Sequence, residues 1–187
     1  MTPELKICGV NDAAFAAEAE RLGANYLGFI FAPGTPRAVT PEQVTGIVRG
    51  LSGSARRVGV FVKQSPEEIV SIMRQVGLDI VQLHRRASSE DVAAIRSAGY
   101  EVWTLAGGAS GDGVLFDSSH GDGETVLRKG EYKGILAGGI SVDNLAVACL
   151  AEPDVIDVSG SLESSRGVKS IPLLRAFIAS WNESRRK

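Results

Sequence analysis

The chain alternates between two patterns of hydrophobic and polar positions. Short apolar segments are followed by longer segments in which apolar residues recur every three or four positions. The first pattern is typical of buried strands and the second of helices with one buried face. Their alternation at intervals of roughly 20 residues predicts βα units and a parallel sheet. The expected strands are Leu5–Cys8, Tyr26–Ile30, Arg57–Val62, Ile80–Leu83, Glu101–Leu105, Gly113–Asp117, Gly134–Ala137 and Val155–Val158.

Start and stop signals mark the helices between these strands. Thr40–Gln43 and Ser65–Glu68 each have the sequence of a capping box with proline at the first helical position. Gly77 follows the second of these helices as a stop. We expect the helix after the seventh strand to be capped at Ser141, and the last helix to cover about Ile171–Trp181.

The segments after the fifth and sixth strands, Ala106–Asp112 and Ser118–Tyr132, are too short for full helices. Eight βα units can form either an open doubly wound sheet or a closed barrel. Even repetition without a dinucleotide-binding fingerprint favours the (β/α)8 barrel. The 187 residues fall below the roughly 200 at the low end for that fold, and the two shortened helices account for the difference. We expect one domain over residues 1–187.

Composition and charge exclude several classes of function. The formal net charge is -2, so the composition does not indicate a surface that binds nucleic acid or an anionic membrane. No apolar run approaches the roughly 18 residues of a membrane span, and the N-terminus lacks signal-peptide features. We therefore expect a cytoplasmic protein, in which Cys8 and Cys149, the two cysteines, are free thiols.

Chemically distinctive residues gather where the expected strands end. In a (β/α)8 barrel the active site lies at the C-terminal ends of the strands. Six of the eight strands end in such residues. They are Cys8 after the first strand, Arg37 after the second, His84 after the fourth, Asp117 after the sixth, Gly138 and Gly139 after the seventh, and Ser159, Gly160 and Ser161 after the eighth.

The glycine loops after the seventh and eighth strands form a pair. These are the loops that commonly bind phosphate in this fold, through backbone N–H groups and a helix N-terminus. The alternative is that both are ordinary turns with helix caps. Their occurrence together at these two positions favours phosphate binding.

Cys8 and Asp117 are candidate reactive residues. Lys6 or a nearby helix N-terminus is expected to lower the pKa of the Cys8 thiol, which leaves a nucleophile, a metal ligand, a redox sensor or a base as its role. Asp117 ends an apolar run, where a carboxyl group can have a raised pKa and act as a general acid. The alternative for Asp117 is a structural carboxylate that caps the next turn.

The remaining candidates have simple structural alternatives. Arg37 is either a bidentate partner for a substrate carboxylate or a solvated surface residue. His84 is either a substrate contact or a hydrogen-bonded structural residue, and His120 is expected in solvent. Cys149 is expected to pack inertly in a helix. Two separate histidines and two separate thiols give no spacing for a metal site.

Collinear motifs resemble those of the phosphoribosylanthranilate isomerase family over nearly the whole chain. They are Lys6–Gly9, Gly28–Phe31, Thr35–Arg37, Val58–Val62, Val81–His84, Phe116–Ser118, Ala137–Ile140 with Asn144, and Asp157–Ser159. The resemblance implies a (β/α)8 barrel that isomerises N-(5-phosphoribosyl)anthranilate by an Amadori rearrangement in tryptophan biosynthesis. It implies no metal and no organic cofactor. It also implies a small phosphosugar as the binding partner, without nucleic acid or membrane.

The resemblance also assigns roles. It makes Cys8 the general base and Asp117 the general acid, and it places Arg37 on the anthranilate carboxylate. It places Asp157 near the bridging amine. The phosphate is expected on the loops of the seventh and eighth strands, with Gly138, Gly139, Ser159, Gly160 and Ser161 as binding residues. We expect a monomer or a weak homodimer.

Two loops depart from the family pattern, His120–Thr125 and Ser159–Glu163, although both stay small and contain glycine. Two other functions compete with the isomerase. A different phosphosugar isomerase or epimerase would share the phosphate loops, but it would use paired aspartates on the first and fifth strands or a metal site. A non-catalytic phosphosugar-binding barrel would be expected to have lost Cys8, Asp117 or Arg37, and all three are present.

Overall fold

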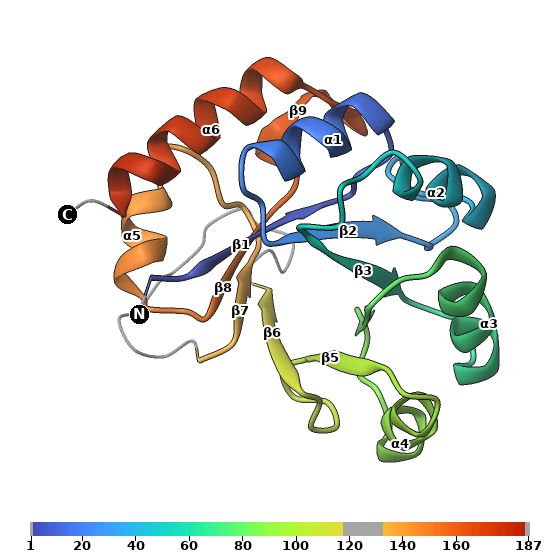
Figure 1. Ribbon diagram of the computed structural model, residues 1–187. Helices are drawn as coiled ribbons and strands as arrows, with labels where there is room; N and C mark the ends of the chain where they lie inside the picture. Colours follow the sequence, from blue (N-terminus) through green and yellow to red (C-terminus); the bar gives the residue numbers. More distant parts are fainter. Residues whose placement is uncertain (1, 118–132, 186–187) are drawn as a thin grey trace.

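The protein is a closed barrel of parallel strands with helices around it (Figure 1). The computed structural model describes residues 2–117 and 133–185. Each strand pairs with the next one along the chain, and β8 closes the barrel by pairing with β1. The strands are β1 (Glu4–Cys8), β2 (Tyr26–Ile30), β3 (Arg56–Phe61), β4 (Ile80–Leu83), β5 (Glu101–Leu105), β6 (Gly113–Asp117), β7 (Ile135–Ala137) and β8 (Val155–Val158).

These strands confirm the predicted (β/α)8 barrel. Five have the predicted bounds, β1 and β7 differ from the prediction by one residue at one end, and β3 is shifted by one residue toward the N-terminus at both ends. The agreement follows from burial on both faces of a parallel sheet, which makes each strand a short continuous apolar run. Apolar runs of this kind are readable in a sequence without knowledge of the partner strand.

Among the described residues, helices cover the outside of the barrel, and none lies between β5 and β6. They are α1 (Ala13–Arg21), α2 (Pro41–Val48), α3 (Pro66–Val76), α4 (Ser89–Ser97), α5 (Leu145–Leu150) and α6 (Ile171–Ser184). Both predicted capping boxes are present, at Thr40 with Gln43 and at Ser65 with Glu68. Gly77 ends α3 in the left-handed conformation, with φ 73°. No described helix has the length and apolar character needed to cross a bilayer.

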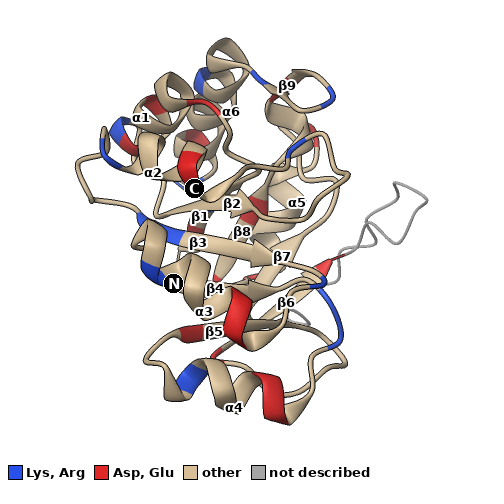
Figure 2. Cartoon of the chain, turned by 90° about the vertical axis from the view of Figure 1, so that its right-hand side faces the viewer, with Lys and Arg blue, Asp and Glu red and all other residues tan. Residues whose placement is uncertain are grey.

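The apolar core has two layers. Side chains such as Phe15, Phe29 and Met73 pack between the helices and the barrel wall. Side chains such as Val58 and Leu115 fill the barrel interior. The two layers exist because alternate residues of each strand point to opposite faces. On the face shown in Figure 2, acidic and basic residues are interspersed over the helices and strand ends.

Two predictions about the connections can be checked. The segment between β5 and β6 contains no helix, as expected. The helix after β7 was predicted to be capped at Ser141, and this is wrong, because α5 begins only at Leu145. Asn144 holds the intervening turn: its Oδ1 accepts a hydrogen bond from Ser141 N, and its Nδ2 donates to Gly139 O. The predicted loop over 118–132 lies outside the described residues.

The segment after β8 has a structure that the sequence pattern did not predict. A 3-10 turn, η1 (Gly160–Leu162), is followed by a small antiparallel hairpin of β9 (Glu163–Ser165) and β10 (Val168–Lys169). These elements are two or three residues long, which is too short for a hydrophobic period to be seen. The hairpin lies at the edge of the site described below.

Candidate active site

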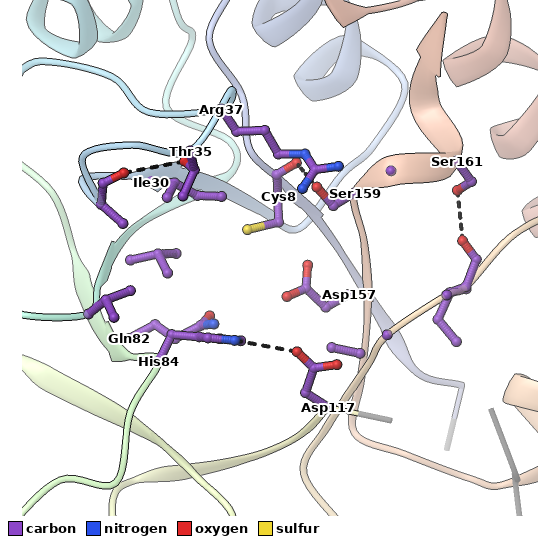
Figure 3. A pocket seen from close by; sticks show the side chains of 18 residues that line it. Cys8, Ile30, Thr35, Arg37, Gln82, His84, Asp117, Asp157, Ser159 and Ser161 are labelled. Carbon is purple, nitrogen blue, oxygen red and sulfur yellow. Dashed lines mark hydrogen bonds and ion pairs between the residues drawn. The ribbon is translucent and has the colours of Figure 1, made fainter. Parts of the chain in front are cut away.

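A cavity of about 590 Å³ opens at the C-terminal ends of the strands (Figure 3). All ten residues predicted for the site line this cavity. They are Cys8, Arg37, His84, Asp117, Gly138, Gly139, Asp157, Ser159, Gly160 and Ser161. The barrel topology brings them together, because parallel strands deliver their C-terminal ends to the same rim. Their chemical roles stay predictions.

Cys8 is the last residue of β1 and is 7% exposed. It lies in register with Gly28 on β2. A Cβ atom at position 28 would lie 2.9 Å from Cys8 Sγ and 3.2 Å from Lys6 Nζ. The glycine therefore leaves the space in which the thiol and the ammonium group lie close together.

Lys6 is fully buried in the barrel interior and pairs with Asp157. Its Nζ lies 2.6 Å from Asp157 Oδ2. The pair forms because Lys6 on β1 is in register with Asp157 on β8. Lys6 and Cys8 are two residues apart on one strand, so both side chains point to the same face. The family resemblance implies a place for Asp157 near the bridging amine, and its pairing with Lys6 was not predicted.

The electrostatics of Cys8 differ from the sequence-based expectation. Burial raises the pKa of the Cys8 thiol, and the charge of Asp157 raises it further. Lys6 lowers the pKa of this thiol, as predicted, but its effect is smaller than that of burial. The expected net decrease in the pKa of Cys8 is therefore wrong. The depth of the thiol is the physical reason, since desolvation disfavours the thiolate.

Asp117 ends β6 and points into the cavity toward His84, which follows β4. His84 Nε2 lies 3.4 Å from Asp117 Oδ2. Cys8 lies across the cavity from this pair (Figure 3). The arrangement places a thiol and a carboxyl group on two sides of the space available to a ligand.

Gln82 is a cavity residue to which no role was assigned from the sequence. It is 1% exposed and lines the cavity from β4. Neither Gln82 Oε1 nor Asp157 Oδ1 has a hydrogen-bond partner among the described residues. Buried acceptors are normally satisfied, so these two oxygens are suited to receive donors from a ligand. The signal that could have found Gln82 is an amide in the middle of an otherwise apolar strand.

Arg37 lies at the rim of the cavity and is held by Glu163 on β9. Its Nε and Nη2 donate to the two carboxylate oxygens of Glu163, at 2.6 and 2.9 Å. The arginine side chain is 28% exposed and that of Glu163 only 4%. Arg37 was predicted as a site residue from the sequence, and Glu163 was not. No local pattern links the two residues, which are 126 positions apart.

The two predicted phosphate loops are joined to each other and to β1. Ser161 Oγ donates to Ile140 O at 2.7 Å, across the loops after β7 and β8. Ser159 Oγ donates to Cys8 O at 3.1 Å. Gly138 and Gly139 have φ values of 93° and 64°, which favour glycine. The two serine hydroxyls thus hold the loops in place. Helix α5 is six residues long and begins only at Leu145, so its N-terminus does not lie at this turn.

Several other predicted residues are accounted for. Cys149 is partly buried, packs against the apolar core, and lies 3.7 Å from Ser184 Oγ through its sulfur. His120 lies outside the described residues, as do Ser118 and Ser119. Within residues 2–117 and 133–185, no group of three or more histidine, cysteine, aspartate or glutamate side chains is arranged to hold a metal ion.

Known proteins match this chain over nearly its full length. A family model described as N-(5'phosphoribosyl)anthranilate (PRA) isomerase matches residues 5–180. The N-(5'-phosphoribosyl)anthranilate isomerase of Granulibacter bethesdensis is 32% identical over 205 residues, which cover 96% of this chain and 98% of the relative.

Solved structures give the same result. The phosphoribosyl anthranilate isomerase of Thermus thermophilus superposes with a TM-score of 0.86 at 33% identity, covering 96% of this chain and 98% of that one. A phosphoribosyl anthranilate isomerase in complex with reduced 1-(o-carboxyphenylamino)-1-deoxyribulose 5-phosphate superposes with a TM-score of 0.82 at 27% identity, covering 97% and 99%. The chain therefore belongs to the N-(5'-phosphoribosyl)anthranilate isomerase family.

Proposed function

We propose that this chain converts N-(5-phosphoribosyl)anthranilate into 1-(2-carboxyphenylamino)-1-deoxyribulose 5-phosphate, an Amadori rearrangement in tryptophan biosynthesis. Membership of the family supports the assignment. The observation that carries it is the position of Cys8 and Asp117 across one cavity (Figure 3), with Arg37 and the two glycine loops at its rim.

The first chemical step is opening of the ribose ring. A neutral Asp117 donates its proton to the ring oxygen as the bond between that oxygen and C1 breaks. The nitrogen lone pair then forms a C1–N double bond, which leaves an iminium ion and a new hydroxyl group. His84, 3.4 Å from Asp117, is placed to orient the carboxyl group.

The second step is proton abstraction. The iminium ion makes the hydrogen on C2 acidic, and the Cys8 thiolate removes it to give an enolamine. Tautomerisation of the enolamine gives the ketone. The buried ammonium of Lys6 favours the thiolate against the cost of burial, and so helps Cys8 act as a base.

Binding residues orient the substrate for both steps. The phosphate lies on the loops of β7 and β8, the carboxylate pairs with Arg37, and Asp157 accepts a hydrogen bond from the bridging amine. The unpaired Oδ1 of Asp157 supports that last role. We expect the reaction in the cytoplasm, with the protein a monomer or a weak homodimer.

A competing phosphosugar isomerase or epimerase is expected to use paired aspartates on the first and fifth strands or a metal site. These strands end in Cys8 and Leu105. A pair of carboxylates at these two positions is therefore not available, and the residue types favour the Amadori reaction.

The test is a coupled assay with freshly prepared phosphoribosylanthranilate and indole-glycerol-phosphate synthase. Cys8→Ala and Asp117→Asn are expected to lower turnover by roughly 10²–10⁴-fold, the usual contribution of a positioned acid or base. Cys149→Ala is the matched control, because that thiol lies outside the cavity lining. Product formation at only the uncatalysed rate would leave a non-catalytic barrel, and near-normal turnover in both active-site variants would contradict the assigned roles.

A further inference from the structure

Glu163 is placed to control the geometry of Arg37, although it does not line the cavity itself. Each of its carboxylate oxygens receives two donors. Oε1 accepts from Arg37 Nε at 2.6 Å and from Lys169 Nζ at 3.1 Å. Oε2 accepts from Arg37 Nη2 at 2.9 Å and from Gly167 N at 3.0 Å. Because its two oxygens accept four hydrogen bonds, this carboxylate is held in one position.

Lys169 also holds the Glu163 carboxylate in place. Its side chain is fully buried, and it lies beside Glu163 because the β9–β10 pairing puts the two residues in register. Lys169 Nζ also donates to Ser159 O at 2.9 Å. Ser159 in turn donates through Oγ to Cys8 O. A continuous chain of hydrogen bonds therefore connects the Glu163 carboxylate with the loop after β8 and with β1.

The Arg37 side chain lies close to two glycines. A Cβ atom at Gly9 would lie 2.8 Å from Arg37 Cδ, and one at Gly160 would lie 3.4 Å from Arg37 Nη2. The side chain thus passes over two glycines before it reaches Glu163. Its Nε and Nη2 are engaged by that residue, whereas Nη1 has no such partner among the described residues.

The charges of the cluster also suit an incoming anion. Arg37 and Lys169 carry two positive charges and Glu163 one negative charge. The three groups together therefore keep one net positive charge beside the cavity. A simple Arg37–Glu163 pair would be neutral, so the second cation preserves the attraction for a carboxylate.

We propose that Glu163 and Lys169 are positioning residues that hold the Arg37 guanidinium at the rim in the orientation needed to receive the carboxylate of the substrate ring. The inference rests on the proposed function, since it assumes that Arg37 meets this carboxylate. It extends that function by making the fit of the carboxylate depend on the hairpin after β8.

The test compares two ligands on each protein by titration calorimetry. The first is reduced 1-(o-carboxyphenylamino)-1-deoxyribulose 5-phosphate, and the second is the same compound built on aniline, without the carboxylate. Their affinity ratio measures the contribution of the carboxylate. In Glu163→Gln this ratio is expected to fall roughly tenfold, the value of one charge-assisted hydrogen bond, while the aniline compound keeps its affinity within about twofold.

The variants separate positioning from general damage. A loss of fold quality would weaken both ligands equally and leave the ratio unchanged. Lys169→Met is expected to lower the ratio in the same direction, and Glu67→Gln, an exposed carboxylate on α3, is the matched control with an unchanged ratio. In the coupled assay, Glu163→Gln is expected to raise KM more than it lowers kcat.

Two failures are distinguishable. If the wild-type protein binds the carboxylate compound no better than inorganic phosphate, the proposed function fails. If the wild-type protein shows a large ratio and Glu163→Gln keeps it within twofold, the proposed function stands and the positioning role of Glu163 is wrong.

Discussion

The Lys6 ammonium and the Asp157 carboxylate form an ion pair 2.6 Å long inside the barrel, with side chains 0% and 6% exposed. Burial of either charge alone costs desolvation free energy, and the attraction between the two charges offsets part of this cost. The pair also lies next to Cys8, whose sulfur shares with Lys6 the space left by Gly28. The Lys6 ammonium thus pairs with Asp157 and also favours the thiolate of Cys8, the proposed base.

Lys6→Met should destabilise the protein through the carboxylate that it leaves behind. Removal of one member of a buried pair costs about 3–5 kcal/mol of unfolding free energy. Lys6→Met combined with Asp157→Asn should recover most of this loss, because no unpaired charge remains. Urea unfolding of the three proteins measures the effect. A double variant as unstable as Lys6→Met would show that packing, not charge pairing, is the cause.

The reactivity of the Cys8 thiol should increase at a higher pH than that of an ordinary thiol. Burial raises the pKa of this thiol in the unliganded protein, so the thiolate forms at a higher pH than for an ordinary thiol, whose pKa is about 8.5. The alkylation rate with iodoacetamide, measured against pH in a Cys149→Ser background, reports the midpoint. Lys6 and Lys169 favour the thiolate and Asp157 opposes it. Lys6→Met should therefore move the midpoint further up, whereas a wild-type midpoint below the ordinary value would contradict the burial effect.

Glu163 should stabilise the fold at neutral pH and lose this effect in acid. Burial raises the pKa of Glu163, but hydrogen bonds from Arg37 and Gly167 and the charge of Lys169 together outweigh burial and lower this pKa to about 2. A carboxylate with a lowered folded-state pKa contributes stability above its ordinary pKa, and the contribution disappears as pH falls through the folded-state value. The difference in Tm between the wild type and Glu163→Gln should therefore be largest near about pH 7 and shrink from about pH 4.5 toward pH 2. A difference that does not change with pH would mean that charge is not involved.

Gly167→Ala should cost more stability than Gly53→Ala, although both glycines have left-handed φ values, 85° and 84°. Any side chain in this conformation costs about 1–2 kcal/mol. At Gly53 a Cβ atom meets nothing within 4 Å, whereas at Gly167 it would lie 2.5 Å from Pro36 O. Thermal unfolding of the two variants gives the comparison. Because Pro36 precedes Arg37, Gly167→Ala should also weaken binding of the carboxylate ligand, and equal Tm losses would contradict the steric argument.

The pattern of the sequence was sufficient to predict the barrel and the residues at its rim. Buried parallel strands are short apolar runs, and capping signals such as Thr40 with Gln43 act within a few residues, so both can be read locally. Once eight βα units are recognised, topology alone places Cys8, Asp117 and Arg37 at one end of the barrel. The positions of these residues required no knowledge of side-chain contacts.

The contacts that hold those residues in place are visible only in the folded protein. The pairs Lys6–Asp157 and Arg37–Glu163 join residues 151 and 126 positions apart, and the hairpin that carries Glu163 is too short for a sequence period. The structure also reversed the expected direction of the pKa shift of Cys8. A neighbouring lysine is visible in the sequence, but the depth of a thiol is not, and desolvation outweighs the nearby charge. Contacts between distant residues and degrees of burial are properties of the assembled barrel.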